Sequence, residues 1–285
     1  MTRFVIRSLA CMLFACRPET STQPPAPSTP PTATTTGELP ITGMVSEEEF
    51  KRMHELRGDE APAPKGTMID LAGGKAYLSL PEHAKAPLPA IVVIHEWWGL
   101  NDHIKHWTDR LAADGYAALA VDLYAGKVAT NSDEAMALVK SVDEPKARAT
   151  LAAAHAFLKD DPRVAATKRG VIGWCFGGGW SLQAAIAEPD LDAAVIYYGR
   201  LVTDPEPLKA IHAQLLGVFG DRDHGIPPAA VDEFVTALKQ AGKTIEIHHY
   251  DADHAFANPS NPKYDTKAAA DAWSHVRAFF HRTLR

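Results

Sequence analysis

Short apolar runs alternate with longer amphipathic stretches over most of the chain from residue 67 onward. Continuous apolar runs of this length predict buried strands, and apolar positions three and four apart predict helices with one buried face. The predicted strands are residues 67–71, 75–80, 90–94, 117–121, 169–173, 193–197, 215–219 and 244–249. The predicted helices lie near residues 103–113, 132–159, 178–187, 228–241 and 264–281. The alternation predicts an α/β fold with a doubly wound, mostly parallel sheet and helices on both faces.

Two elements precede or open this alternation. Residues 46–57 begin with Ser46 and three glutamates and continue with apolar residues at helical spacing. This pattern predicts a short capped amphipathic helix, which we expect at the edge of the domain, with a connector to residue 64. The first two strands meet across Gly73-Gly74, which predicts a hairpin.

The first sixteen residues have the pattern of an export signal. Arg3 and Arg7 flank the start of an apolar stretch that is too short to span a bilayer as a helix. The stretch ends in Leu13-Phe14-Ala15-Cys16, which resembles a bacterial lipobox except for the bulky phenylalanine. We therefore expect a signal peptide over residues 1–16 and a membrane tether through lipidated Cys16. A cleaved signal with a soluble periplasmic product is the alternative, and both place the protein at the cell envelope.

Residues 17–45 are expected to form a disordered linker behind this signal. Residues 17–40 contain seven Pro and seven Thr among twenty-four positions and almost nothing apolar. Such a segment cannot bury enough apolar surface to offset the entropy of ordering, so an extended tether is expected. The folded domain is therefore expected over residues 65–285.

Composition narrows the range of functions. The net charge of −6 and the pI near 6.1 provide no basic footprint for nucleic acid, so a small uncharged substrate fits better. Two of the three cysteines, Cys11 and Cys16, fall in the N-terminal segment, which excludes a disulfide framework within the domain. The domain therefore contains Cys175 alone, and a buried structural cysteine is the alternative to a reactive one.

Cys175 lies in the turn Gly173-Trp174-Cys175-Phe176-Gly177-Gly178, between a predicted strand and a predicted helix. A sharp strand-to-helix turn needs glycines around its nucleophile because side chains at these positions would clash. The helix N-terminus also stabilises a thiolate and a developing oxyanion. The pattern therefore predicts a nucleophile elbow with Cys175 as the reactive residue.

Candidates for the base and the orienting acid follow later strands. In elbow hydrolases the chain order is nucleophile, acid, histidine. Asp223 follows the strand 215–219, and His254 follows the strand 244–249. A histidine can move the proton between thiol, leaving group and water, while a carboxylate fixes its tautomer. Asp221 is the competing acid and His224 the competing base, and both also fit ordinary loop structure.

These residues belong to a set of motifs that resembles the dienelactone hydrolase family over about residues 65–283. The motifs occur in family order and are His95-Glu96-Trp97-Trp98-Gly99, Asp122-Leu123-Tyr124, the elbow, Tyr197-Tyr198-Gly199, Gly220-Asp221-Arg222-Asp223-His224 and His254-Ala255-Phe256. The resemblance implies an α/β-hydrolase fold, no metal or organic cofactor, and a hydrolase that cleaves a small ester or lactone.

The resemblance also implies roles for individual residues. The triad would be Cys175, His254 and Asp223, with Glu96 beside the thiol as the group that takes its proton when substrate binds. The oxyanion hole would use the backbone N–H groups of Trp97 and Phe176. The substrate pocket would be bordered by aromatic residues, for which plain core packing is the alternative: Tyr198, Trp98 and Tyr124.

Two departures from the family change the expected substrate. The family holds a substrate carboxylate with two arginines, and the corresponding positions here are Gly126 and Asn258. Lys127 would be at best a point charge in place of a bidentate guanidinium. We therefore expect a neutral ester, lactone or thioester. The loop 258–264 is expected to cover the pocket.

Other chemistries fit the sequence less well. His103 and His106 on one helix and the adjacent His248 and His249 do not provide three convergent ligands in one cluster, so no metal site is expected. A non-catalytic binding lipoprotein of the cell envelope would retain the fold but not need the triad residues. A peptidase or acyltransferase remains compatible with the elbow.

Overall fold

The computed structural model describes Met1, residues 39–57 and residues 60–285. The predicted signal peptide, Cys16 and residues 17–38 of the predicted linker lie outside the described residues. The strands are β1 (Thr67–Leu71), β2 (Gly74–Ser79), β3 (Ala90–Ile94), β4 (Ala117–Val121), β5 (Arg169–Trp174), β6 (Ala193–Tyr197), β7 (Gln214–Gly220) and β8 (Glu246–Tyr250). The helices are α1 (Glu47–Met53), α2 (Asp102–Ala113), α3 (Ser132–Lys140), α4 (Glu144–Asp160), α5 (Phe176–Ala187), α6 (Pro205–Leu208), α7 (Pro228–Gln240) and α8 (Thr266–Leu284).

The strands form one eight-stranded sheet in the order β1-β2-β4-β3-β5-β6-β7-β8. The β1–β2 hairpin and the β2–β4 pair are antiparallel, and all later pairs are parallel. Strands β3, β4 and β6 are buried along their whole length, as expected when helices cover both faces of a sheet. The α/β-hydrolase fold expected from the sequence is therefore confirmed.

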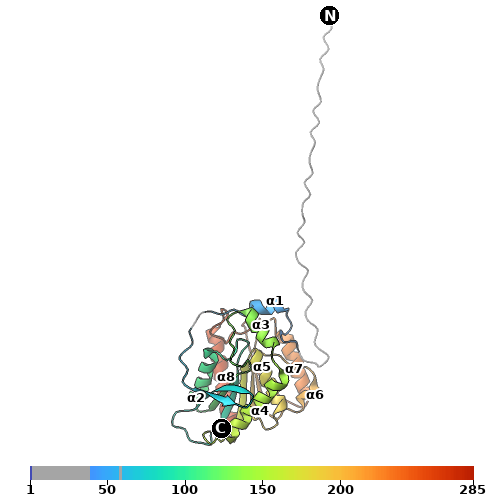
Figure 1. Cartoon of the computed structure of the whole chain (residues 1–285). Coiled ribbons are helices and arrows are strands. Elements are labelled where there is room, and N and C mark those ends of the chain that lie inside the picture. The colour runs from blue at the N-terminus through green and yellow to red at the C-terminus, as the bar shows by residue number, and fades with distance from the viewer. Residues whose placement is uncertain (2–38, 58–59) are drawn as a thin grey trace.

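Helices cover the two faces of the sheet as separate layers (Figure 1). On one face α2 contacts α8, where the rings of Trp107 and Trp273 lie 4.7 Å apart. On the other face α4 contacts α5, where Arg148 Nη2 donates a hydrogen bond to Gln183 at 2.7 Å. Helix α5 packs directly on β3, β5 and β6 in the middle of the sheet. This packing fixes the N-terminus of α5 at the carboxyl ends of the central strands.

One predicted helix is two helices in the structure. The expected helix 132–159 is interrupted between Lys140 and Glu144, so that α3 and α4 are separate. Asp143 caps α4 by accepting a hydrogen bond from the Lys146 amide at 2.9 Å, and a proline lies in the first turn of α4. Proline fits the first turn of a helix but not its interior, because it lacks the N–H that an interior turn needs. The short helix α6 was not predicted.

The segment before β1 differs most from expectation. Residues 39–45, the end of the predicted linker, pack on the domain, with Leu39 and Val45 buried. Helix α1 is shorter than the predicted 46–57 and lies at the margin of the domain, beside α3 (Figure 1). We call residues 39–57 the N-terminal strap. Leu39, Val45 and Phe50 order the strap, because each buries its side chain against the domain, whereas Ile41 and Leu56 stay exposed.

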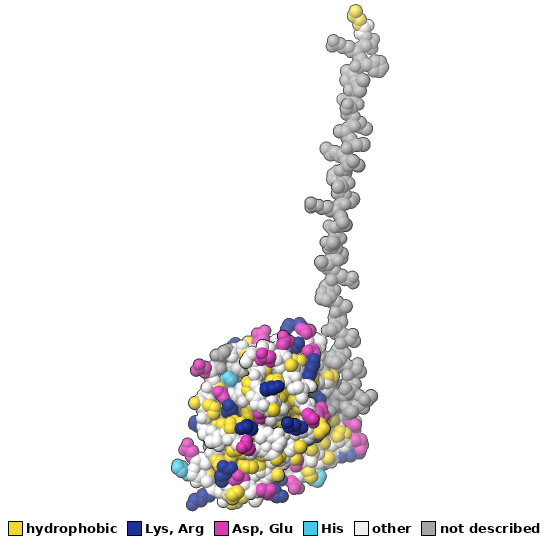
Figure 2. Space-filling model, viewed as in Figure 1, with side chains coloured by type: hydrophobic (Ala, Val, Ile, Leu, Met, Phe, Trp, Pro, Cys, Tyr) yellow, Lys and Arg dark blue, Asp and Glu magenta, His cyan; other side chains and the backbone are white. Residues whose placement is uncertain are grey.

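The surface contains side chains of both charges. On the face seen in Figure 2, acidic and basic side chains are interspersed. Two surface ion pairs join the strap to α3, from Lys51 to Asp133 at 2.9 Å and from Lys140 to Glu47 at 2.5 Å. Within the residues that the structure describes, no helix is long and apolar enough to cross a membrane.

Candidate active site

Cys175 lies at the turn between β5 and α5, in a backbone conformation that few residues adopt. Its φ is 53° and its ψ is −115°. A Cβ on Gly173 would lie 2.1 Å from the Gly177 carbonyl oxygen, and a Cβ on Gly177 would lie 2.4 Å from that of Ile94. The turn therefore needs glycine at both positions, and the strain at Cys175 is typical of a functional site.

The side chains of Asp223 and His254 contact each other close to this turn. The loop after β7 provides Asp223, and the loop after β8 provides His254, whose Nδ1 lies 2.6 Å from Asp223 Oδ2. The other carboxylate oxygen accepts the amide N–H groups of Gly225 and Ile226 at 2.8 and 3.0 Å. Only 1% of Asp223 and 3% of His254 is exposed. The carboxylate therefore holds the imidazole with its Nδ1 protonated and its Nε2 available.

The competing acid and base lie elsewhere. Asp221 is exposed and contacts His249 Nδ1 at 2.9 Å. His224 is exposed and lies 3.4 Å from Glu49 Oε1. Neither lines the pocket around Cys175. Of the two candidate pairs, the structure brings only Asp223 and His254 together at the nucleophile.

The pKa values of His254 and Glu96 are both raised, but for different reasons. Burial alone would lower the pKa of His254, but Asp223 and the sulfur of Cys175 outweigh it and raise the pKa well above its usual value. Burial raises the pKa of Glu96 to about 7, although His254 and a hydrogen bond from Asn258 act against the rise. His254 therefore binds a proton strongly once the sulfur of Cys175 is a thiolate, and Glu96 is half protonated near pH 7.

The thiol has a neighbour that the sequence did not indicate. His54, which follows α1 in the strap, places its Nε2 3.3 Å from the sulfur of Cys175. Glu96, expected as the partner of the thiol, instead accepts a hydrogen bond from the side chain of Asn258. The role of Glu96 as proton acceptor stays a prediction. A local clue to His54 exists, since Phe50 and His54 are four residues apart on the apolar side of α1.

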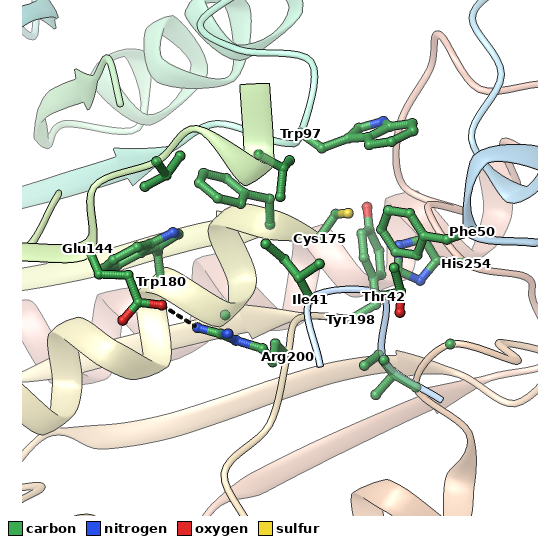
Figure 3. Close-up of a pocket in the computed structure, with 17 residues that line it drawn as sticks. Ile41, Thr42, Phe50, Trp97, Glu144, Cys175, Trp180, Tyr198, Arg200 and His254 are labelled. Atoms are coloured by element: carbon green, nitrogen blue, oxygen red, sulfur yellow. Dashed lines mark ion pairs between the residues drawn. The ribbon is translucent and has the colours of Figure 1, made fainter. Parts of the chain in front are cut away.

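Cys175 opens into a hollow of about 690 Å³, a figure that includes the open solvent at its mouth. Figure 3 shows the sulfur pointing toward Tyr198, Phe50 and His254, with Trp97 above it in this view. At the far end of the hollow, Arg200 forms an ion pair with Glu144 at 3.9 Å. The remaining labelled side chains of the hollow come from the strap and α5: Ile41, Thr42 and Trp180.

The two residues whose amide N–H groups are expected to form the oxyanion hole both lie beside Cys175 in the hollow. Phe176 is the first residue of α5, and Trp97 follows β3; both residues line the hollow. Neither amide donates a hydrogen bond to an acceptor within the described part of the chain. His95 steadies the Trp97 loop, because its Nδ1 donates to the Glu96 carbonyl at 2.6 Å and its Nε2 accepts from the Leu123 amide at 3.2 Å.

Other predicted pocket residues have different places. Tyr198 lines the hollow, whereas Trp98 and Tyr124 do not. Trp98 packs on Trp97 at a centroid distance of 4.8 Å, and Tyr124 packs on His95 at 4.6 Å. Neither lines the hollow, although the phenol of Tyr124 lies near the sulfur of Cys175. Trp98 and Tyr124 are therefore packed in the core, which was the alternative to a place in the substrate pocket.

At the two positions where the resemblance predicts arginine, this chain has residues that form hydrogen bonds within the fold. Asn258 binds Glu96, and Gly126, at φ 86°, donates its amide N–H to the carboxylate of Asp122. Lys127 lines a separate hollow beside α4. The loop 258–264 was expected to cover the pocket, but its residues do not line it. It instead anchors the strap, since the Arg57 amide donates to the Ser260 carbonyl at 2.6 Å.

Two groups of three possible metal ligands occur among the described residues, contrary to the expectation that no such cluster exists. One is formed by His54, Cys175 and His254, and the other by Glu246, His248 and His275. Within each group the ligand atoms lie within 4.8 Å of one another. Neither group includes His103 or His106. The first group is the candidate nucleophile with its two neighbouring imidazoles.

A cysteine on a strand-to-helix turn of a mostly parallel sheet, with an acid and a histidine on later loops in that order, is the arrangement of an α/β-hydrolase. Comparison with known proteins gives the particular family. Residues 75–284 match the dienelactone hydrolase family, and the chain belongs to it. The protein is accordingly a hydrolase of the ester and lactone type.

Several relatives span most of the chain. One from Methylorubrum extorquens, with the provisional name carboxymethylenebutenolidase, is 35% identical over 222 residues, which are 73% of this chain and 76% of that protein. A solved structure from Klebsiella pneumoniae, provisionally named a dienelactone hydrolase, has a TM-score of 0.64 at 30% identity and covers 73% of this chain and 92% of its own. A solved dienelactone hydrolase-like promiscuous phosphotriesterase from metagenomic libraries has a TM-score of 0.68 at 26% identity, covering 78% and 99%.

Proposed function

We propose that the protein hydrolyses small uncharged esters or lactones through a covalent acyl-enzyme on Cys175, with His254 and Asp223 completing a triad. The observation that supports this most is the buried Asp223–His254 hydrogen bond of 2.6 Å behind the elbow. It leaves His254 Nε2 without a hydrogen-bond partner among the described residues, and a ring nitrogen of His254 lies within 4.8 Å of the sulfur. A buried nitrogen in this state is suited to a proton that arrives only during the reaction.

The chemistry proceeds in two transfers. The proton of Cys175 moves to His254 Nε2, the sulfur attacks the carbonyl carbon, and the carbonyl electron pair moves to oxygen. The N–H groups of Trp97 and Phe176 stabilise the resulting oxyanion, and His254 donates its proton to the leaving alkoxide. Water then loses a proton to His254 and attacks the thioester, which releases the acid and restores the thiol.

The walls of the hollow favour an uncharged substrate. Most lining side chains are apolar, among them Phe50, Trp97 and Ile226. The guanidinium of Arg200 lies near the carboxylate of Glu144, which offsets its charge. An anionic substrate would therefore leave water for an apolar site and lose solvation without full compensation. Neutral esters, lactones and thioesters avoid this penalty.

A substrate panel tests the proposal. Lactones, aryl esters, thioesters and a neutral aryl phosphotriester should be offered to the wild type and to Cys175→Ala. We expect cleavage of at least one uncharged carboxylic ester or lactone by the wild type and none by the variant. Equal activity of the two proteins would contradict the mechanism. Cleavage of no compound would favour a binding protein, and transfer of the acyl group to an added alcohol or amine would favour an acyltransferase.

We further propose that the protein acts at the bacterial cell envelope, tethered through a lipid on Cys16. The support is the sequence of the first sixteen residues, with two arginines, an apolar stretch and a cysteine after alanine. Cys16→Ser should move the expressed protein from the membrane fraction to the soluble fraction. Finding the wild type in the soluble fraction would instead favour a cleaved signal.

A further inference from the structure

The side chain that forms a hydrogen bond with the sulfur of Cys175 comes from a part of the chain that the family match does not cover. The family match begins at residue 75, whereas His54 belongs to the N-terminal strap. His54 is 1% exposed, and its Nε2 lies 3.3 Å from the sulfur of Cys175. The strap therefore adds a second imidazole to a site whose expected chemistry needs only one.

The hydrogen bonds of His54 determine where the protons are. Its Nδ1 lies 2.7 Å from the carbonyl oxygen of Phe50. A carbonyl oxygen only accepts, so Nδ1 must be protonated and donate. Burial is the main cause that holds the pKa of His54 well below its usual value, and a proton on His254 would lower it further, so the ring is neutral. Its Nε2 then has a lone pair, and the hydrogen bond to sulfur requires Cys175 to donate as a thiol.

The surroundings of His54 keep this geometry in place. Its ring packs on Phe50 at a centroid distance of 4.2 Å and on Trp97 at 4.4 Å. Its carbonyl oxygen accepts a hydrogen bond from Ser132 Oγ at 2.8 Å. Just before α1 in the chain, the Met44 amide donates a hydrogen bond to the Gly225 carbonyl at 2.8 Å, which joins the strap to the loop that carries Asp223.

We propose that His54 is a positioning residue for the nucleophile: in the resting enzyme it accepts the hydrogen bond of the Cys175 thiol and so keeps the sulfur protonated, although the sulfur faces His254 (Figure 3). This role rests on the proposed function of Cys175. Substrate entering the hollow displaces the S–H from His54 toward His254 Nε2. The S–H bond breaks there, the proton passes to His254, and the sulfur attacks with the freed electron pair.

The nucleophile of the resting enzyme would therefore be a thiol of low reactivity. A thiolate is the form of cysteine that alkylating agents and oxidants attack, and a thiol reacts far more slowly. Holding the resting sulfur as a thiol therefore protects it until substrate binds. The other titratable groups around the sulfur are His254 with Asp223 behind it, Glu96 beside His254, and the phenols of Tyr124 and Tyr198.

The experiment is the pH profile of Cys175 alkylation by iodoacetamide in the full chain, with two variants of His54. His54→Phe keeps a ring against Phe50 and Trp97 but has no acceptor for the S–H. His54→Gln can place an amide oxygen where Nε2 lies. We expect His54→Phe to lower the pH midpoint of alkylation and raise the rate below the midpoint about fivefold, equal to about 1 kcal/mol, the net value of one hydrogen bond. His54→Gln should remain close to the wild type.

Three results would overturn the proposal. An unchanged midpoint in His54→Phe would show that His54 does not hold the proton, and a higher midpoint would show that His54 stabilises the thiolate. An equal shift in both variants would trace the effect to packing. If the variants fail to fold, the ultraviolet absorbance of the thiolate is measured in the wild type, with Cys175→Ala as the blank. We expect little thiolate absorbance at pH 7. The full absorbance of one thiolate at that pH would contradict the proposal. Alkylation needs no ester hydrolysis, so these outcomes are independent of the substrate panel.

Discussion

Replacing Asp223 by asparagine tests the orientation of the catalytic imidazole. In the wild type, Asp223 Oδ1 accepts two amide N–H groups and Oδ2 accepts from His254 Nδ1 at 2.6 Å. Asparagine would keep its oxygen toward the two amides, because they can only donate. Its NH₂ group would then face His254 Nδ1. A hydrogen bond forms there only if the ring moves its proton to Nε2, and Nε2 could then no longer accept the proton of the thiol.

The size of the effect follows from this change of tautomer. An equivalent aspartate-to-asparagine change in the triad of a serine protease lowers kcat about 10⁴-fold, which corresponds to about 5 kcal/mol of transition-state stabilisation. We expect a loss of the same order for Asp223→Asn. Asp221→Asn is the matched control, because this carboxylate lies two residues away, is exposed, and contacts only the surface residue His249 among the described residues. Its rate should stay within about twofold of the wild type.

The assay is the initial rate of hydrolysis of an activated aryl ester by the two variants and the wild type. Circular dichroism and the melting temperature of each protein control for folding. A folded Asp223→Asn protein with a rate within about tenfold of the wild type would refute the assigned role of Asp223. A large loss in Asp221→Asn instead would transfer the role to the competing acid.

Two further predictions concern the surroundings of the nucleophile. Burial raises the pKa of Glu96 from 4.5 to about 7, so its neutral form stabilises the fold fully below pH 4.5, and this contribution is lost as the pH rises through 7. Glu96→Gln cannot ionise and should remove about 3 kcal/mol of that pH dependence of the unfolding free energy, measured by urea denaturation; identical profiles would contradict the shift. Gly177→Ala would place a Cβ 2.4 Å from the Ile94 carbonyl oxygen and should lower the melting temperature by about 5 °C or more. Gly74→Ala, with 3.7 Å to its nearest atom, should change it by about 1 °C at most, and equal effects would contradict the close approach at the elbow.

The parts of the site that follow from local patterns were predictable from the sequence. The elbow is a strand, a glycine-rich turn and a helix within adjacent residues, and β5, Cys175 and α5 lie where this pattern placed them. Asp223 and His254 could be selected because parallel strands bring their following loops to one edge of the sheet. The same reasoning located β1, β3, β4 and β6 with their observed bounds. The break between α3 and α4 also has a local signal in the sequence, because Asp143 and the following Pro145 are typical of a helix start.

The contact between His54 and Cys175 could not be predicted in the same way. It joins residues 121 positions apart, and no periodic pattern in the strap specifies which part of the domain the strap covers. Residues 17–38 contain almost nothing apolar, and Leu39 and Val45 come only at the end of this segment, so composition predicts a disordered linker up to residue 45. Both side chains are nevertheless buried. Their burial depends on a surface that the domain provides. Tertiary contacts therefore determined the conformation of this segment, against its local preference.

The most direct test of the central claim is to trap the acyl-enzyme. The wild-type protein is mixed with an activated ester, quenched in acid within the first turnover, and examined by intact-protein mass spectrometry followed by peptide mapping. The account predicts a mass increase equal to one acyl group, located on the peptide that contains Cys175 and absent from Cys175→Ala. Rapid ester cleavage with no adduct on Cys175, together with full activity of Cys175→Ala, would contradict it.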